Sequence, residues 1–422
     1  MLCGTDFSLW NLVLAHTKPD RLKPVLPMWY SFAPMRIFVL GTGATGSYLA
    51  HLLTRQGHQV TCGDRDLDRA RRFLGKKSTI PVVQVNARNL WGIVRAAKGS
   101  QLLVNASASV FNEIVLRAAL RIRAHYTDLS AHLTRNPFKA EQLRFDKRFQ
   151  EKNRLAIITA GAAPGLTNLL VARGSELMDS VDAVFIRLYE STESDDPVSQ
   201  WSPEVSFDEA ISLPRIVREG RFKYGKRFGE KEKFRFPPPI GESTVVLAAQ
   251  DEVATVPYFL KLKEMDVKIG GNEIDRLRRW YRQGKLSKSR GLVASRFPKT
   301  PSPRQVARLI RKGSLQNARF AAAVIVRGMK QDRAIEVRYD AIFPSLFQIR
   351  RRGLGVSPVS YATAQMASLF IKHFPRDSAG VFPPGAIPVE NRQAILKDLK
   401  ARDIRVTMKV TKKTESEDEE EF

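Results

Sequence analysis

The stretch MRIFVLGTGATGSYLA, residues 35–50, decides the fold of this 422-residue chain. Its apolar run, Ile37–Leu40, predicts a strand that is covered on both faces of its sheet. Glycines follow at G-x-G-x-x-G spacing, and apolar residues then recur at helical intervals from Thr45 to Gln56. A strand, a glycine-rich turn and a helix in this order are the context that a dinucleotide-binding fingerprint requires. The stretch therefore predicts the first unit of a doubly wound parallel sheet.

Each glycine of the turn has its own predicted role. Gly41 permits the tight turn, Gly43 lets the backbone approach a pyrophosphate, and Gly46 lets the helix pack closely on the strand. The N–H groups that open the helix then attract the phosphates, because a helix N-terminus carries a partial positive charge. The predicted phosphate-binding residues are Gly41, Thr42, Gly43, Ala44, Thr45 and Gly46.

The choice of cofactor depends on the end of the second predicted strand. Asp64 lies there, 18 residues after Gly46, where a carboxylate can accept both ribose hydroxyls. Its charge would repel a 2′-phosphate, which favours NAD. The neighbouring Arg65 could stack on adenine or hold that phosphate. NAD and NADP therefore both stay open, with a slight preference for NAD.

Strand and helix patterns alternate from residue 37 to about residue 160. The predicted strands are 37–40, 59–62, 81–85, 101–107, 125–130 and 154–159. Parallel neighbours need crossover connections, so six strands with helices between them predict an α/β fold of the Rossmann type. Ligands bind outside the carboxyl ends of such strands, and we expect Asn105, Ala106 and Ser107 near the nicotinamide ribose. Asn105 could also be an ordinary strand-end cap, and the two roles do not exclude each other.

A second turn, ITAGAAPGLTNLLVARG at residues 158–174, repeats the strand–turn–helix arrangement at the same edge of the sheet. Its helix N-terminus is expected to face the nicotinamide or a substrate carboxylate, and an interdomain hinge is the alternative. Asp128 is either a ribose contact or a strand-end cap. Trp201 is either a pocket wall or a buried interdomain residue. The substrate candidates are Asp128, Pro164, Gly165, Asn168 and Trp201.

Composition excludes several classes of protein. Two cysteines cannot build a disulfide framework, and six histidines without an H-x-x-x-H pair predict no metal site. No apolar run reaches the ~20 residues that a membrane span needs, and we expect a cytoplasmic protein. The net charge of +26 concentrates in 276–313 and 215–235. A solvated basic exterior is the favoured explanation, and nucleic-acid binding is not expected but stays open.

Five stretches resemble the saccharopine dehydrogenase-like (saccharopine reductase) oxidoreductases, which include carboxynorspermidine dehydrogenases. They are VLGTGATGSYLAHLLTRQGHQVTCGDRD (39–66), HYTDLS (125–130), GAAPGLTN (161–168), QWSPEVSFDEA (200–210) and GVFPPGAIPVENRQAILKDLKARDIRV (380–406). The resemblance runs from about Met35 to Val410, and the order of the stretches along the chain is its strongest part. Many relatives carry an acid where this chain has Ala163, which puts the substrate or the chemistry in question.

The resemblance implies a Rossmann domain with an inserted α+β substrate and dimerisation domain. The predicted divisions are a leader that is not native or is disordered (1–34), the Rossmann domain (35–165), the α+β domain (166–355), helices returning to the Rossmann domain (356–408) and a disordered acidic tail (409–422). It also implies a homodimer and NAD(P)-dependent hydride transfer at a C–N bond, imine or secondary amine, of an amino-acid-derived substrate. A non-catalytic dinucleotide sensor of the same fold is the alternative, and a nucleic-acid-associated protein a weaker one. The sequence selects no catalytic residue.

Overall fold

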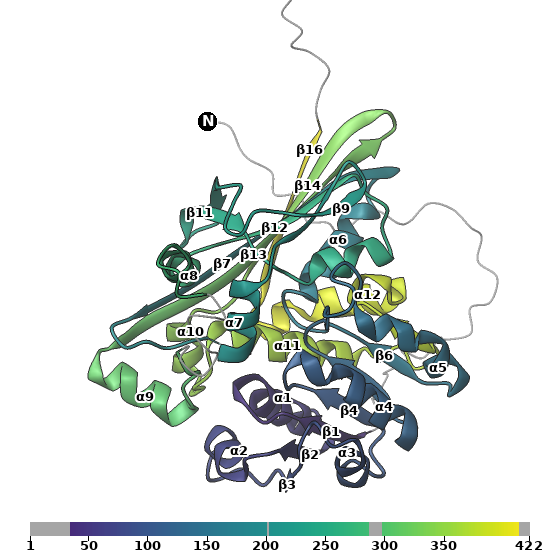
Figure 1. The fold of residues 1–422 in the computed structure, drawn as a ribbon, viewed down its shortest axis with the longest axis vertical. Coiled ribbons are helices and arrows are strands. Elements are labelled where there is room, and N and C mark those ends of the chain that lie inside the picture. The colour runs from purple at the N-terminus through teal and green to yellow at the C-terminus, as the bar shows by residue number, and fades with distance from the viewer. Residues whose placement is uncertain (1–33, 201, 287–297, 413–422) are drawn as a thin grey trace, which may run out of the picture. The chain divides into compact units, whose positions relative to one another are not determined.

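The computed structural model describes residues 34–200, 202–286 and 298–412. The first of its two sheets has seven strands in the order β15-β6-β5-β4-β1-β2-β3, and every pairing is parallel (Figure 1). The strands are β1 (Arg36–Leu40), β2 (Gln59–Asp64), β3 (Val82–Gln84), β4 (Leu102–Asn105), β5 (His125–Asp128), β6 (Leu155–Ile157) and β15 (Gly380–Phe382). The predicted Rossmann-type parallel sheet is confirmed.

Helices cover both faces of this sheet. They are α1 (Ala44–Arg55), α2 (Leu67–Leu74), α3 (Leu90–Ala96), α4 (Asn112–Ile122), α5 (Asp146–Glu151) and α6 (Leu166–Ser175). Residues 37–40 of β1 are at most 1% exposed, as a strand covered on both faces requires. The strand order reverses between β1 and β4, so a crevice opens where their carboxyl ends part.

The second sheet is mixed, with nine strands. They are β7 (Ser180–Ser194), β8 (Arg215–Arg218), β9 (Arg221–Tyr224), β10 (Glu232–Phe236), β11 (Gly241–Leu247), β12 (Glu264–Gly270), β13 (Leu315–Lys330), β14 (Arg333–Ile342) and β16 (Arg405–Lys412). Its helices are α7 (Pro203–Ile211), α8 (Asn272–Arg282), α9 (Pro303–Lys312) and α10 (Leu346–Arg351). Among the described strands of this second sheet, β12 and β7 pair in parallel and all other pairings are antiparallel.

The two sheets share one hydrophobic core. A single cluster of buried side chains includes Leu49 of α1, Leu169 of α6, Val324 of β13 and Phe370 of α11 (Pro358–Lys372). The rings of Tyr48 and Tyr361 stack with centroids 5.6 Å apart and join α1 to α11. The described residues from Pro34 onward accordingly form one compact unit, and the predicted domain divisions at 165 and 355 stay predictions.

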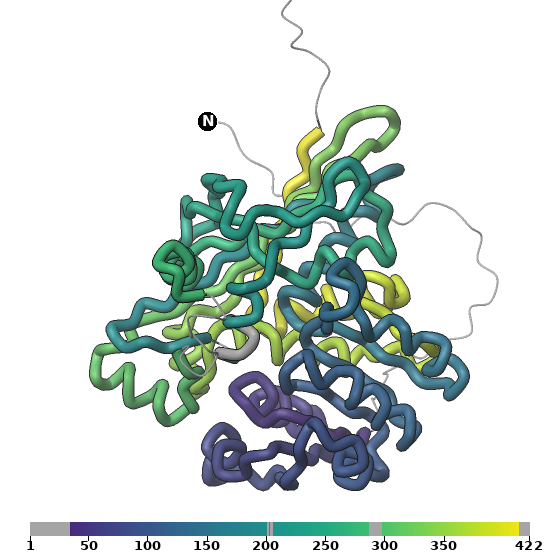
Figure 2. Tube along the Cα trace, viewed as in Figure 1, coloured from purple at the N-terminus to yellow at the C-terminus, as the bar shows by residue number. Residues whose placement is uncertain are grey.

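The C-terminal segment contributes one strand to each sheet. After α11, β15 adds a strand to the first sheet beside β6; α12 (Val389–Asp398) follows, and β16 then pairs with β14 of the second sheet (Figure 2). The predicted start of a tail at residue 409 is therefore wrong, because residues 409–412 complete the β16 ladder. The rest of the predicted tail and all of the predicted leader except Pro34 lie outside the described residues, as does Trp201. Among the described helices, none combines the length and apolar character that crossing a membrane demands.

Candidate dinucleotide site

The glycine turn after β1 packs too tightly for side chains at two of its three glycines. Gly41 has a φ of +95°, and a Cβ there would lie 2.6 Å from the backbone nitrogen of Ser107. A Cβ at Gly46 would lie 1.9 Å from the carbonyl oxygen of Gly41. Only glycine at this position therefore lets α1 pack so closely against the turn. Gly43 differs, since the nearest atom to its Cβ would be Nη2 of the flexible Arg69, at 3.2 Å. Gly43 therefore leaves space that a ligand can fill.

Asp64 ends β2 directly beside this turn. Its Oδ2 accepts a hydrogen bond from the backbone N–H of Thr42 (2.8 Å), and its Oδ1 accepts one from Asp66 (3.1 Å). Arg69 forms an ion pair with the same carboxylate, with Nη1 3.6 Å from Oδ2. The Asp64 side chain is 6% exposed but borders the cleft described next. A carboxylate oriented by two backbone N–H groups is well placed to accept ribose hydroxyls.

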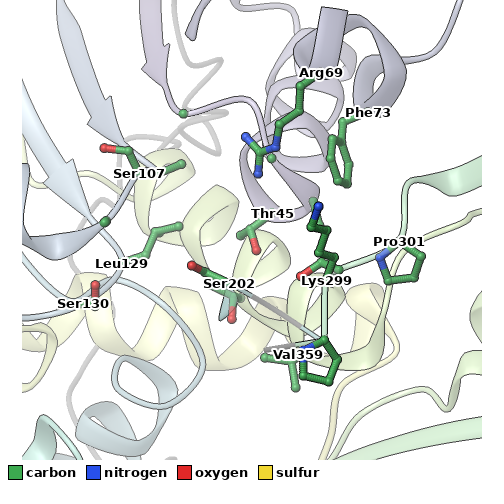
Figure 3. Close-up of a pocket in the computed structure, with 18 of the residues that line it drawn as sticks. Thr45, Arg69, Phe73, Ser107, Leu129, Ser130, Ser202, Lys299, Pro301 and Val359 are labelled. Carbon is green, nitrogen blue, oxygen red and sulfur yellow. The ribbon is translucent and has the colours of Figure 1, made fainter. Parts of the chain in front are cut away.

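A cleft of about 1890 Å³ opens in front of the turn and extends to the second sheet. Its walls include Arg69 and Phe73 of α2, Ser107 after β4, Leu129 and Ser130 after β5, and Lys299 before α9 (Figure 3). Lys299 reaches in from the side of the second sheet, and its ammonium group points toward α2 (Figure 3). The cleft therefore joins the predicted cofactor crevice to a space that is large enough for a second ligand.

Most of the predicted cofactor residues line this cleft. Those that do are Gly41, Gly43, Ala44, Thr45, Asp64, Arg65, Ala106 and Ser107. Thr42, Gly46 and Asn105 do not, and each supports the turn from behind. Asn105 Oδ1 accepts from the N–H and the hydroxyl of Ser107, while its amide donates to Asn112 Oδ1 at 2.7 Å. These hydrogen bonds are those of a strand-end cap, and a contact between Asn105 and the nicotinamide ribose stays a prediction.

The second turn is split between cleft and interior. Pro164 lines the cleft, as does Ala163. Gly165 has a φ of +132°, and a Cβ there would lie 1.8 Å from the carbonyl oxygen of Gly161. Asn168 is fully buried: its Oδ1 accepts from Gly165 N–H (3.1 Å) and its amide donates to Thr255 Oγ1 (2.9 Å). The geometry therefore gives Gly165 and Asn168 structural roles and leaves Pro164 as the substrate candidate from this turn.

Asp128 lies beneath the cleft floor and is completely buried. Its carboxylate accepts from the N–H of Thr159 (2.7 Å), the hydroxyl of Tyr126 (2.9 Å) and the amide of Gln142 (3.1 Å). Burial nevertheless raises the pKa of Asp128 to about 7, against these hydrogen bonds. The contacts fit the strand-end cap better than a ribose contact.

The far end of the cleft is acidic, although the chain as a whole is basic. Glu190 of β7, Glu209 of α7 and Asp251 line it. Burial raises the pKa of Glu209 well above its usual range, and the nearby charges of Asp251 and Glu190 raise it further. Burial also raises the pKa of Asp251, although Arg215 lies 3.6 Å from its Oδ1. The raised pKa values favour the protonated forms of Glu209 and Asp251, which makes both candidates for proton transfer.

Sequence reasoning missed these acids and most of the cationic side chains that surround the cleft. The missed residues are Arg69, Arg72, Arg88, Glu190, Glu209, Asp251, Lys299 and Arg308. Arg69 and Arg72 lie on α2, the helix that follows Asp64 in the chain. Their position just after Asp64 is a signal in the sequence that could have indicated them. The acids come from separate segments around the second sheet, and no spacing rule connects them.

Four of the nine basic residues in the cluster at 215–235 form ion pairs with neighbouring acids. Its ion pairs include Arg215–Asp251 (3.6 Å), Arg218–Asp266 (2.9 Å), Lys223–Glu219 (3.0 Å) and Lys233–Glu242 (3.4 Å). The other cluster, 276–313, includes residues 287–297, which lie outside the described residues.

The fold and the cleft define a dinucleotide-binding protein of the Rossmann class. Residues 37–157 match the family model of the saccharopine dehydrogenase NADP binding domain. Apo saccharopine dehydrogenase (L-Glu forming) from Saccharomyces cerevisiae has the same fold: its TM-score is 0.66 at 11% identity, over 89% of this chain and 100% of that one. The predicted resemblance to a saccharopine dehydrogenase-like family is therefore confirmed. The domain match supports an NAD(P)-dependent oxidoreductase.

Two further solved structures match over similar lengths with lower TM-scores. A meso-DAPDH mutant from Clostridium tetani E88 gives a TM-score of 0.41 at 13% identity, covering 86% of this chain and 99% of that one. A probable dehydrogenase from Thermotoga maritima gives 0.42 at 12% identity, covering 89% of this chain and 98% of that one.

Proposed function

We propose that this protein transfers a hydride between NAD(P) and a C–N bond, imine or secondary amine, of an amino-acid-derived substrate. The observation that carries the proposal is the acidic end of the cleft, formed by Glu190, Glu209 and Asp251 in an otherwise basic chain. Hydride transfer to carbon is helped by a positive charge on the attached nitrogen. Carboxylates nearby stabilise that iminium charge, since oriented groups act strongly in a site with little water.

Glu209 is the proposed proton donor. Burial and the neighbouring acids raise its pKa, which favours the protonated form that can donate a proton to an imine nitrogen. In the reverse direction the carboxylate would accept the proton of the oxidised amine. The nicotinamide supplies the hydride in the one direction and accepts it in the other, and the protein contributes orientation and electrostatics.

The cleft also presents cations to a substrate that carries a carboxylate. Lys299 and Arg308 line it, both with exposed side chains. A guanidinium group binds a carboxylate through two parallel hydrogen bonds, and an ammonium group binds it as a point charge. A molecule with an amine at one end and a carboxylate at the other would pair with both kinds of charge in this cleft. This charge arrangement is that of an amino acid.

The cofactor proposal includes both nicotinamide dinucleotides. Asp64 favours the free 2′-hydroxyl of NAD, as the sequence predicts. Arg65, Arg69, Arg72 and Arg88 line the same end of the cleft, and several arginines can together hold a 2′-phosphate. We therefore propose that NAD(H) and NADP(H) both bind, and that these arginines set the affinity for NADP.

The experiment is an amine-plus-aldehyde screen in which nicotinamide absorbance reports turnover, run beside calorimetric titration of the cofactors. Turnover with amino acids as the amine partner supports the proposal. Cofactor binding without turnover on any amine–aldehyde pair contradicts it and favours the sensor, for which Ala163 in place of an acid is the motivating observation.

A further inference from the structure

Three side chains converge at the edge of the first sheet, outside the cleft lining. Glu113 lies in the first turn of α4, His132 in the loop after β5, and Glu141 at the start of the 3₁₀ helix η2 (Glu141–Phe145). One donor atom of each lies within 4.8 Å of a donor atom of the other two. The side chains are largely buried, with exposed fractions of 13%, 15% and 4% respectively.

One donor atom of each side chain lacks a hydrogen-bond partner among the described residues. These atoms are Glu113 Oε1, His132 Nδ1 and Glu141 Oε2. The other polar atoms are held: Glu113 Oε2 pairs with Arg144, His132 Nε2 lies 2.7 Å from Thr134 Oγ1, and Glu141 Oε1 accepts from the backbone N–H of Arg135 at 2.5 Å. Such outer contacts are how proteins orient metal-ligating histidines and carboxylates.

The spacing fits a metal ion better than a direct hydrogen bond. His132 Nδ1 and Glu141 Oε2 are 3.6 Å apart, which is too long for a hydrogen bond. Two ligands that each bind Zn²⁺ at about 2.1 Å with tetrahedral geometry are separated by about 3.4 Å. Leaving two buried carboxylate oxygens without partners is costly, and a divalent cation between them would offset that cost. The guanidinium of Arg135 also approaches Glu141 Oε2, at 4.0 Å, but its side chain is 67% exposed and can turn toward solvent.

We propose that Glu113, His132 and Glu141 bind a divalent transition-metal ion, with a water molecule as the fourth ligand. Two carboxylates and a neutral imidazole match the charge of Zn²⁺, and the imidazole nitrogen favours zinc or cobalt over magnesium. The sequence predicted no metal site, because the histidines show no H-x-x-x-H pair. The proposed site needs no such pair, since its ligands come from three segments and include only one histidine. The ion would fasten the loop that carries Leu129 and Ser130, part of the cleft wall, to α4. This inference is independent of the proposed reaction.

The test is calorimetric titration of ZnCl₂, and separately MgCl₂, into chelator-treated protein at pH 7.5. We expect one Zn²⁺ per chain with micromolar or tighter affinity, far weaker Mg²⁺ binding, and the visible absorption of tetrahedral Co²⁺ when cobalt replaces zinc. His132→Gln and Glu141→Gln should each weaken Zn²⁺ binding at least 100-fold. The control is His51→Gln, because His51 lies on α1 with its Nε2 2.9 Å from the carbonyl oxygen of Leu74. Circular dichroism verifies that each variant is folded.

Two results would overturn the proposal. One is the absence of stoichiometric Zn²⁺ or Co²⁺ binding to the unsubstituted protein, which would mean that the carboxyl groups share a proton or pair with His132 as an ion cluster. The other is Zn²⁺ binding that survives in both folded variants, which would place the ion elsewhere.

Discussion

The backbone N–H of Thr42 donates a 2.8 Å hydrogen bond to Oδ2 of Asp64. The bond joins the glycine turn after β1 to the end of β2, so the two halves of the proposed cofactor site form one unit. Asp64 accordingly has two roles, since it holds the turn in place and offers its carboxylate to the cleft.

Asp64→Ala is expected to weaken NAD binding by about tenfold or more. The reason is that a hydrogen bond to a charged group contributes about 1.5–3 kcal/mol, and the substitution removes the carboxylate that would accept the ribose hydroxyls. NADP binding should weaken less, because the lost carboxylate also repels the 2′-phosphate. Arg72→Ala should have the converse effect and weaken NADP more than NAD. Calorimetric titration of both cofactors measures these affinities.

Asp68→Ala is the matched control for Asp64→Ala, because Asp68 is exposed on α2 and does not line the cleft. Equal losses of NAD and NADP affinity in Asp64→Ala would show that the carboxylate only supports the turn.

Gly46→Ala is expected to destabilise the fold. Its Cβ would lie 1.9 Å from the carbonyl oxygen of Gly41, so α1 must move away from β1. Overpacking of this kind costs about 1–3 kcal/mol or more, which thermal unfolding can measure. Gly43→Ala is the comparison, since it meets only the flexible end of Arg69. A Gly46→Ala variant as stable as Gly43→Ala would contradict the described packing.

Asp128→Asn tests the pH dependence of stability. Burial raises the pKa of Asp128 to about 7 in the folded protein, above its value of about 3.9 when unfolded. The folded state therefore binds this proton more tightly, and the associated stability is lost as pH rises from about 4 through 7. Asparagine has no such loss. The stability of the unsubstituted protein minus that of Asp128→Asn should fall by up to about 3 kcal/mol between pH 5 and pH 8.

Urea unfolding at several pH values measures this difference. Other buried acids, such as Glu252, titrate in both proteins and cancel in the comparison. A difference that is constant across the range would mean that Asp128 ionises normally in the folded protein.

Glu209→Gln tests the proposed proton donor. In the unsubstituted enzyme the kcat for imine reduction should fall as pH rises through the raised pKa of Glu209, because the protonated acid is the active form. The variant should lose about 100-fold or more in kcat and most of this pH dependence, with cofactor affinity unchanged. Glu219→Gln, which alters an exposed acid paired with Lys223, is the control. An unchanged pH profile in Glu209→Gln would remove Glu209 from the mechanism.

The sequence predicted the cofactor half of the site better than the substrate half. Gly41, Gly46 and Asp64 follow from backbone requirements that only certain residues satisfy at fixed spacing. From the sequence, Asn168 was a substrate candidate like Pro164. In the structure its side chain is buried and caps the start of α6 instead. Glu209 and Asp251 reach one cleft only through tertiary folding, and nothing in their local pattern distinguishes them from acids on the surface. The strand β15 was not predicted because it lies far from β6 in the sequence and only tertiary folding places the two strands side by side.

The central claim is that bare backbone around Gly43 binds the diphosphate of a nicotinamide cofactor. Calorimetric titration of NAD(H) and NADP(H) into the unsubstituted protein and into Gly43→Trp tests it most directly. We predict saturable binding of one dinucleotide per chain to the unsubstituted protein, and its loss in a folded Gly43→Trp variant. Undiminished affinity in that variant, or no binding of any nicotinamide dinucleotide to the unsubstituted protein, would contradict the claim.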